Sequence, residues 1–208
     1  MMPVSTGVPH RIYGQSTSGN CHKVRLACDI LKIPYRWHEI DIMEGTTRTP
    51  QYLAMNPNGK VPLLQVDDRT YLPESNAILC YLADGTHLWP GDRLARAQVL
   101  QWLFFEQYSH EPYIAVARFI KVFMKKHDDE RMPNLLKRGY AALDVMEKQL
   151  EGRRFFVGAT LTIADIALFA YTHCAADGGF DLGRYPHLSA WLARCLDQPG
   201  VTPTPAQP

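Results

Sequence analysis

Asn56-Pro-Asn-Gly-Lys-Val-Pro62 and, a hairpin later, Leu72-Pro-Glu-Ser-Asn76 decide the fold of the first part of this chain. Between them, Val61–Val66 is an apolar run bounded by Asn-Gly before it and two aspartates after it, which predicts a buried strand, a tight turn and an antiparallel partner over 70–72. Pro62 cannot donate to a strand ladder, so it belongs at the strand start, and we expect a cis Val61–Pro62 bond there. Such a corner would leave the Val61 backbone open to pair with an extended peptide.

The second half of this motif places polar groups where a helix begins. Ile78, Leu79 and Leu82 follow Ser75 at helical spacing. The free amides at a helix start favour an anion, so Ser75 could bind a carboxylate and Glu74 an adjacent ammonium. Taken alone, Ser75 is as readily an ordinary capping serine. The combination predicts a site for a molecule with an α-carboxylate, an α-amine and a peptide bond.

The combined motif resembles the glutathione-binding half of the cytosolic glutathione transferases, of the bacterial serine or threonine type with theta, phi and Nu-like members. The resemblance implies that Val61 and a cis Pro62 meet the cysteinyl backbone of glutathione, while Glu74 and Ser75 hold its γ-glutamyl end. It also implies ligand contacts from two basic residues, which could equally be solvated charges. These are Arg48, near the glycyl carboxylate, and Lys60.

The order of predicted elements matches a thioredoxin-like domain. A strand over 11–15, a helix over about 20–32 and a strand over 35–42 form a βαβ start, and a short helix near 50 precedes the hairpin and the next helix. The segment 85–93 contains two glycines and a proline, and every later element is helical in period. We therefore expect an α/β thioredoxin-like domain over 1–84, ordered from about residue 10, a linker over 85–93, and an all-α domain over 94–208.

Within the helical domain, a long helix from about residue 94 meets Pro112, which should kink or split it. Further helices are expected near 134–149, 162–175 and 187–196, and the proline-rich tail from about 199 should be loosely ordered. Thr162 and Asp165 have the spacing of a capping box, which we interpret as structural.

The chemistry should lie in the loop from Gln15 to Cys21, which connects a strand end to a helix start, where negative charge is stabilised. From the residues alone, Ser16, Thr17 and Ser18 are as readily turn and cap hydroxyls. The resemblance places the thiol-activating residue at Ser18, ahead of Thr17 and Ser16. It places at Asn20 an asparagine that lies near the thiol in Nu-like members. Cys21 falls inside the first helical turn without a second cysteine in a Cys-x-x-Cys pair, so we expect a packed thiol.

The expected mechanism follows from the pKa of a free thiol, about 8.5, which leaves only a few per cent as thiolate at neutral pH. A hydroxyl that donates to the sulfur favours the thiolate, and so do helix amides. Glutathione would then attack a hydrophobic electrophile, with Ser18 as a donor and Tyr108 and Tyr113, beside Pro112, lining the electrophile pocket. Two alternatives stay open: glutathione-dependent reduction of a disulfide, as in Nu-like relatives, and a non-catalytic binding or scaffold protein.

Composition bears on partners and compartment. The chain has 22 basic and 21 acidic residues and no basic block, so nothing favours nucleic-acid binding. Five cysteines without paired metal spacing predict reduced thiols in a cytoplasmic protein and no metal site. We expect neither a signal peptide nor a membrane span. The resemblance implies a homodimer with a role in detoxification.

Overall fold

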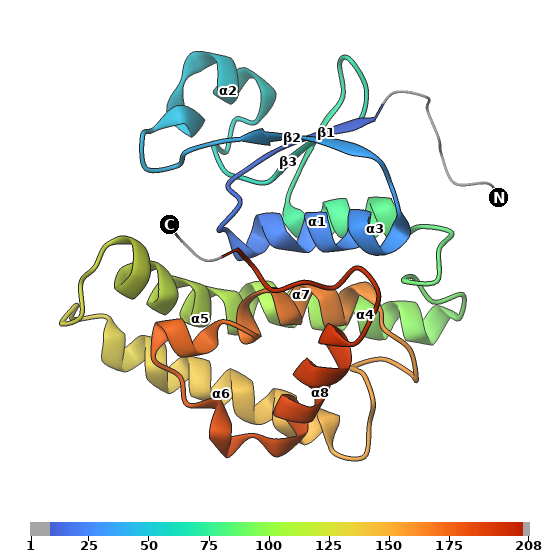
Figure 1. Ribbon diagram of the computed structural model, residues 1–208, viewed down its shortest axis with the longest axis vertical. Coiled ribbons are helices and arrows are strands. Elements are labelled where there is room, and N and C mark those ends of the chain that lie inside the picture. The colour runs from blue at the N-terminus through green and yellow to red at the C-terminus, as the bar shows by residue number, and fades with distance from the viewer. Residues whose placement is uncertain (1–8, 206–208) are drawn as a thin grey trace. The chain divides into compact units, whose positions relative to one another are not determined.

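Two structural units make up residues 9–205, the part of the chain that this computed structural model describes (Figure 1). The first unit runs to Trp89 and includes residues 204 and 205. The second runs from Pro90 to Pro203.

A mixed four-stranded sheet forms the centre of the first unit, in the order β2-β1-β3-β4. Strand β1 (His10–Gly14) runs parallel to β2 (Tyr35–Glu39) and antiparallel to β3 (Leu63–Gln65), which pairs antiparallel with β4 (Tyr71–Pro73). The predicted thioredoxin-like order, βαβ followed by ββα, is confirmed. Strand β2 ends at Glu39, three residues earlier than the apolar pattern indicated.

Helices cover both faces of this sheet because successive strand residues point to opposite sides. Helices α1 (Gly19–Leu31) and α3 (Ser75–Ala83) lie side by side on one face, and α2 (Pro50–Met55) lies on the other, after the short η1 (Thr46–Arg48) (Figure 1). On the α2 face, Tyr52 packs with Ile40 and Leu63. Both faces therefore carry a core, which holds the ends of α1 and α3 in place.

The second unit is all helical. Its long helices are α4 (Arg93–Phe105), α5 (Glu111–Arg118), α6 (Met132–Leu150), α7 (Ile163–Thr172) and α8 (Pro186–Leu196), with two short 3₁₀ turns, η4 (Ala175–Gly178) and η5 (Leu182–Arg184). The predicted break at Pro112 is confirmed, and it takes the form of a π-helical turn, η2 (Glu106–His110), immediately before α5. A second π turn, η3 (Phe119–Phe123), ends α5. No helix within residues 9–205 combines the length and the apolar character needed to cross a membrane.

The predicted capping box at the start of α7 is present and extends further than the motif itself. Asp165 Oδ2 accepts hydrogen bonds from the Thr162 amide and hydroxyl, at 2.9 and 3.0 Å. Asp165 Oδ1 accepts from the Phe156 amide and from Trp191 Nε1, both at 3.0 Å. One buried carboxylate thus ties α7 to the preceding loop and to α8.

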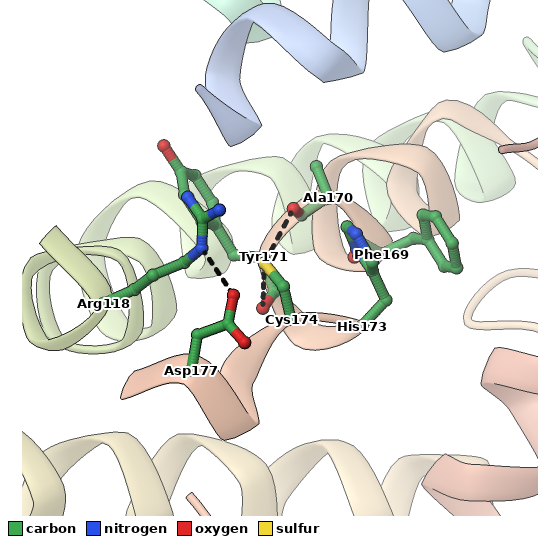
Figure 2. A network of polar contacts seen from close by, with 7 residues as sticks. All are labelled: Arg118, Phe169, Ala170, Tyr171, His173, Cys174 and Asp177. Carbon is green, nitrogen blue, oxygen red and sulfur yellow. Dashed lines mark hydrogen bonds and ion pairs between the residues drawn. The ribbon is translucent and has the colours of Figure 1, made fainter. Parts of the chain in front are cut away.

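A polar network joins α5 to the segment that follows α7 (Figure 2). Arg118 of α5 is buried, and its Nε donates to Asp177 Oδ2 of η4 at 3.1 Å. The Cys174 thiol donates to the carbonyls of Ala170 and Tyr171, at 3.8 and 3.6 Å. Burial raises the pKa of Cys174 to about 11, so this thiol is structural.

Candidate active site

The loop after β1 is held by a carboxylate from the neighbouring strand. The Ser16 amide and hydroxyl both donate to Glu39 Oε1, at 2.8 and 3.2 Å, and Trp37 Nε1 donates to Glu39 Oε2 at 2.6 Å. Thr17 is buried. Glu39 was not among the predicted site residues. It is separated from Ser16 by 23 positions, and nothing in the local sequence indicates the contact.

Ser18 caps α1. Its backbone is extended, at φ −81° and ψ 127°, and its Oγ accepts from the Cys21 amide at 3.4 Å. The side chain is partly exposed. Because Ser16 is bound to Glu39 and Thr17 is buried, Ser18 is the hydroxyl of this loop that combines exposure with a position at a helix N-terminus.

Cys21 is a packed thiol, as predicted. Its side chain is 0% exposed. Burial raises its pKa to about 12, which outweighs the lowering by hydrogen bonds from the Ser18 side chain and the Gln15 backbone. A thiol that stays protonated at neutral pH is a poor nucleophile. Gly14 lies against it, where an added Cβ would come within 2.9 Å of Cys21 Sγ.

The start of α3 has an unusual backbone. Ser75 is the first helical residue, and the capping position belongs to Glu74, which has φ +70° and whose side chain makes no capping bond within residues 9–205. A side chain at positive φ is strained, and such strain is concentrated at functional positions. Helix capping therefore does not explain the positive φ of Glu74. This backbone conformation places an exposed carboxylate at the start of α3.

The two motifs meet in space. Ser75 Oγ donates to Asn20 Oδ1 at 3.2 Å, and Lys23 Nζ donates to Ser75 Oγ at 3.4 Å. Lys23 is 0% exposed, and it was not among the predicted site residues. The sequence carries one indication that Lys23 is buried: it lies four residues before Ala27, on the apolar face of the predicted helix.

The corner before β3 contains the predicted cis Val61–Pro62 bond. The preceding Lys60 carbonyl accepts from Tyr52 Oη and Asn56 Nδ2, both at 2.8 Å. Val61 itself lies outside the ladder, and its backbone takes part in no hydrogen bond within residues 9–205. Its amide and carbonyl are thus available to an added extended segment.

Arg48 and Lys60 are the two basic residues predicted near this corner. Both are exposed, and Arg48 Nη1 donates to the Asn58 carbonyl at 3.3 Å. Gly59, at φ +61°, makes room for the guanidinium, since an added Cβ would lie 2.6 Å from Arg48 Nη1. Their predicted role as ligand contacts stays a prediction.

Tyr108 and Tyr113 belong to the helical unit. Tyr108 lies in the π turn and is 84% exposed, whereas the Tyr113 ring in α5 lies 5.5 Å from the Arg138 guanidinium carbon. Their assignment to an electrophile pocket stays a prediction. Within residues 9–205, no cluster of three or more His, Cys, Asp or Glu side chains is arranged to hold a metal ion.

Comparisons with known proteins match both units. The family model "Glutathione S-transferase, N-terminal domain" matches residues 17–84, and "Glutathione S-transferase, C-terminal domain" matches residues 99–199. A glutathione S-transferase structure from Pseudomonas fluorescens is 52% identical, with a TM-score of 0.92, and covers 95% of this chain and 99% of its own.

Two more distant relatives differ in what their names state. A family member from Pseudomonas fluorescens, with two glutathione molecules bound, is 27% identical with a TM-score of 0.82, and covers 95% of this chain and 92% of its own. The disulfide-bond oxidoreductase YfcG of Escherichia coli is 29% identical over 88% of each chain. On the matches to both domain models and the closely similar structure, the chain belongs to the glutathione S-transferase family.

Proposed function

We propose that the first unit binds glutathione and activates its thiol for attack on an electrophilic small molecule. The observation that carries the proposal is the hydrogen bond between Ser75 and Asn20, because it brings the starts of α1 and α3 to one corner. Ser18, two residues before Asn20, then lies at the same corner as Glu74. The relative that holds two glutathione molecules supports this choice of ligand.

The residues at this corner fit the parts of glutathione. Val61 offers an unbonded backbone amide and carbonyl to the cysteinyl residue, which would add as an extended strand. The Ser75 hydroxyl and the α3 amides suit the γ-glutamyl carboxylate, and the Glu74 carboxylate suits the adjacent ammonium. Arg48 and Lys60 supply positive charge for the glycyl carboxylate.

Ser18 acts as a hydrogen-bond donor in this mechanism. A hydroxyl that donates to the glutathione sulfur favours the thiolate, and the thiol proton leaves to solvent. The Ser18 side chain already lowers the pKa of one sulfur, that of Cys21, although burial dominates there. The thiolate then forms a bond to the electrophilic carbon, and the leaving group departs with the electron pair.

A disulfide substrate is the second candidate, and Asn20 together with the YfcG relative favours it. Here the glutathione thiolate attacks one sulfur of the substrate, forms a mixed disulfide and releases a thiol. A second glutathione resolves the mixed disulfide, so two glutathiones are oxidised for each disulfide reduced. Product analysis with an aryl halide and with a mixed disulfide separates the two reactions.

The proposal also covers the second substrate, the oligomeric state and the cellular compartment. Tyr108 and Tyr113 would line the electrophile pocket, and the protein would act as a cytoplasmic homodimer in detoxification, without a metal. The free cysteines at five positions suit a reducing compartment.

The test is calorimetric titration of glutathione into the wild type, Ser18→Ala and the matched control Ser16→Ala, with thiolate absorbance recorded in the ultraviolet. We expect all three to bind, and Ser18→Ala alone to lose the thiolate signal. If Ser18 lowers the pKa of the bound glutathione thiol from about 8.5 to about 6.5, its loss would lower the thiolate fraction, and with it kcat/KM at neutral pH, roughly 20-fold. If the wild type does not bind glutathione, a binding or scaffold role takes the place of this proposal.

A further inference from the structure

Lys23 is a charged side chain enclosed in the first unit. It is among the largest side chains that are fully buried, and its Nζ lies 3.4 Å from Ser75 Oγ, at the first residue of α3. Burial of an ammonium is unfavourable unless nearby groups stabilise its charge. A long charged side chain placed here therefore needs a reason beyond packing, and its contact with Ser75 suggests one.

The hydrogen-bonding capacity of the two groups fixes the direction of each bond. An ammonium has three donors and no acceptor, so Ser75 Oγ accepts from Lys23 and cannot donate to it. The single hydroxyl proton of Ser75 must point elsewhere, and in this structure it points to Asn20 Oδ1 at 3.2 Å. Lys23 thus commits Ser75 to donate to a group other than Lys23, and it places a positive charge 3.4 Å from the hydroxyl oxygen at the first residue of α3.

Resting on the proposed glutathione site, we propose that Lys23 is a specificity-determining positioning residue that makes the start of α3 selective for a carboxylate. The chemical class selected is a γ-glutamyl thiol with a free α-carboxylate. A carboxylate would accept the hydrogen bond of the Ser75 hydroxyl in place of Asn20 Oδ1. It would also interact with the charge of the Lys23 ammonium. A neutral carboxamide at the same position offers a weaker acceptor and no charge, so it gains little from Lys23.

The test compares two ligands across three proteins. The ligands are glutathione and its analogue in which the γ-glutamyl α-carboxylate is a carboxamide. The proteins are the wild type, Lys23→Met, which keeps side-chain length and removes the charge, and Ser75→Ala, with thermal unfolding of each recorded by circular dichroism. Affinities come from calorimetry, and kcat and KM for glutathione are measured with one electrophile.

We expect the wild type to prefer glutathione by about tenfold or more, since bonds to charged groups are worth that much. Lys23→Met should lose most of this preference by weakening glutathione alone, with KM raised and kcat at saturation unchanged. Equal weakening of both ligands, or a wild type that binds both equally, overturns the proposal for Lys23. If Lys23→Met does not fold, Ser75→Ala decides, because a retained preference there also overturns it. A wild type that binds neither ligand refutes the glutathione site itself.

Discussion

Ser18 differs from the two hydroxyl residues before it, because it caps α1 and is partly exposed. The local sequence does not distinguish the three consecutive hydroxyl residues Ser16, Thr17 and Ser18. Only the resemblance to known transferases favoured Ser18 as the thiol-activating residue. The structure distinguishes them by their contacts: Ser16 donates to Glu39, Thr17 is buried, and Ser18 caps α1. Long-range contacts of this kind cannot be found from local sequence, because the partner lies on another strand.

His173 should make stability depend on pH. Burial lowers the pKa of His173, so the folded protein binds fewer protons than the unfolded chain in the range below about 6.5. Stability is then fully present above that pH and falls as the pH drops, by up to about 1.4 kcal/mol per pH unit. His173→Gln should flatten this decline in melting temperature between neutral and mildly acidic pH.

The exposed His127 provides the control for this prediction. His127→Gln should leave the decline as steep as in the wild type. Equal slopes for His173→Gln and the wild type would show that the partly buried imidazole of His173 does not cause the pH dependence.

At the scale of an element, we expect Glu74 at the start of α3 to lower the stability of the fold while its carboxylate contributes to glutathione binding. Glu74 has φ +70°, where glycine carries no steric cost. Glu74→Gly should therefore raise the free energy of unfolding by roughly 0.5–1 kcal/mol, while the loss of the carboxylate weakens glutathione binding. Chemical denaturation and calorimetry measure the two effects.

Glu74→Gln separates the two causes, since it removes the charge and keeps the side chain at positive φ. We expect weaker glutathione binding without any gain in stability. A stabilised glutamine variant would contradict the strain argument.

The start of α7 should be a stability element. Asp165→Ala leaves the Phe156 amide, the Thr162 amide and Trp191 Nε1 without their buried acceptor. Each such loss costs about 1–3 kcal/mol, so we expect the three losses together to cost at least about 3 kcal/mol in urea denaturation, with glutathione affinity retained in the folded fraction.

Asp92→Ala is the matched control, because Asp92 also caps a helix and accepts from the Ala95 amide at 2.8 Å, but is exposed. The expected cost is about 1 kcal/mol. Similar losses in both variants would mean that burial does not strengthen the Asp165 cap. The capping box could be predicted from sequence because its partners are three residues apart, whereas its bond to Trp191 spans 26 positions.

At the scale of the whole molecule, α4 offers a surface for the proposed homodimer. One side of this helix is exposed, and it includes the large apolar side chains of Leu94 and Phe104, which are 67% and 69% exposed. Apolar surface of this kind is typical of interaction sites. Phe104→Glu should shift the protein from two chains to one in size-exclusion chromatography with light scattering.

Leu196→Glu on α8, also at an exposed apolar position, is the control and should leave the mass unchanged. A wild type that elutes as a single chain would refute the homodimer. A dimeric Phe104→Glu variant would place the interface elsewhere.

Much of the fold could be predicted from the sequence because its signals are local. The order of strands and helices, the Pro62 corner and the break before Pro112 each depend on neighbouring residues, and the structure has all three features. The contacts of Lys23 with Ser75 and of Glu39 with Ser16 depend on tertiary packing across 52 and 23 positions. The sequence thus predicted the loop and the helix start that the proposed site uses, and the structure adds the contacts of Lys23 and Glu39, which no local pattern indicates.

The π turn before α5 fixes the length of the chain there. Each residue of an α-helix advances about 100° around the axis, and a π turn holds one residue more than an α turn. Removal of one residue within Glu106–His110 would restore a regular helix, but it would rotate the buried side chains of α5, such as Ile114, away from their packing partners. Residue count is therefore as strongly constrained at this point as residue identity.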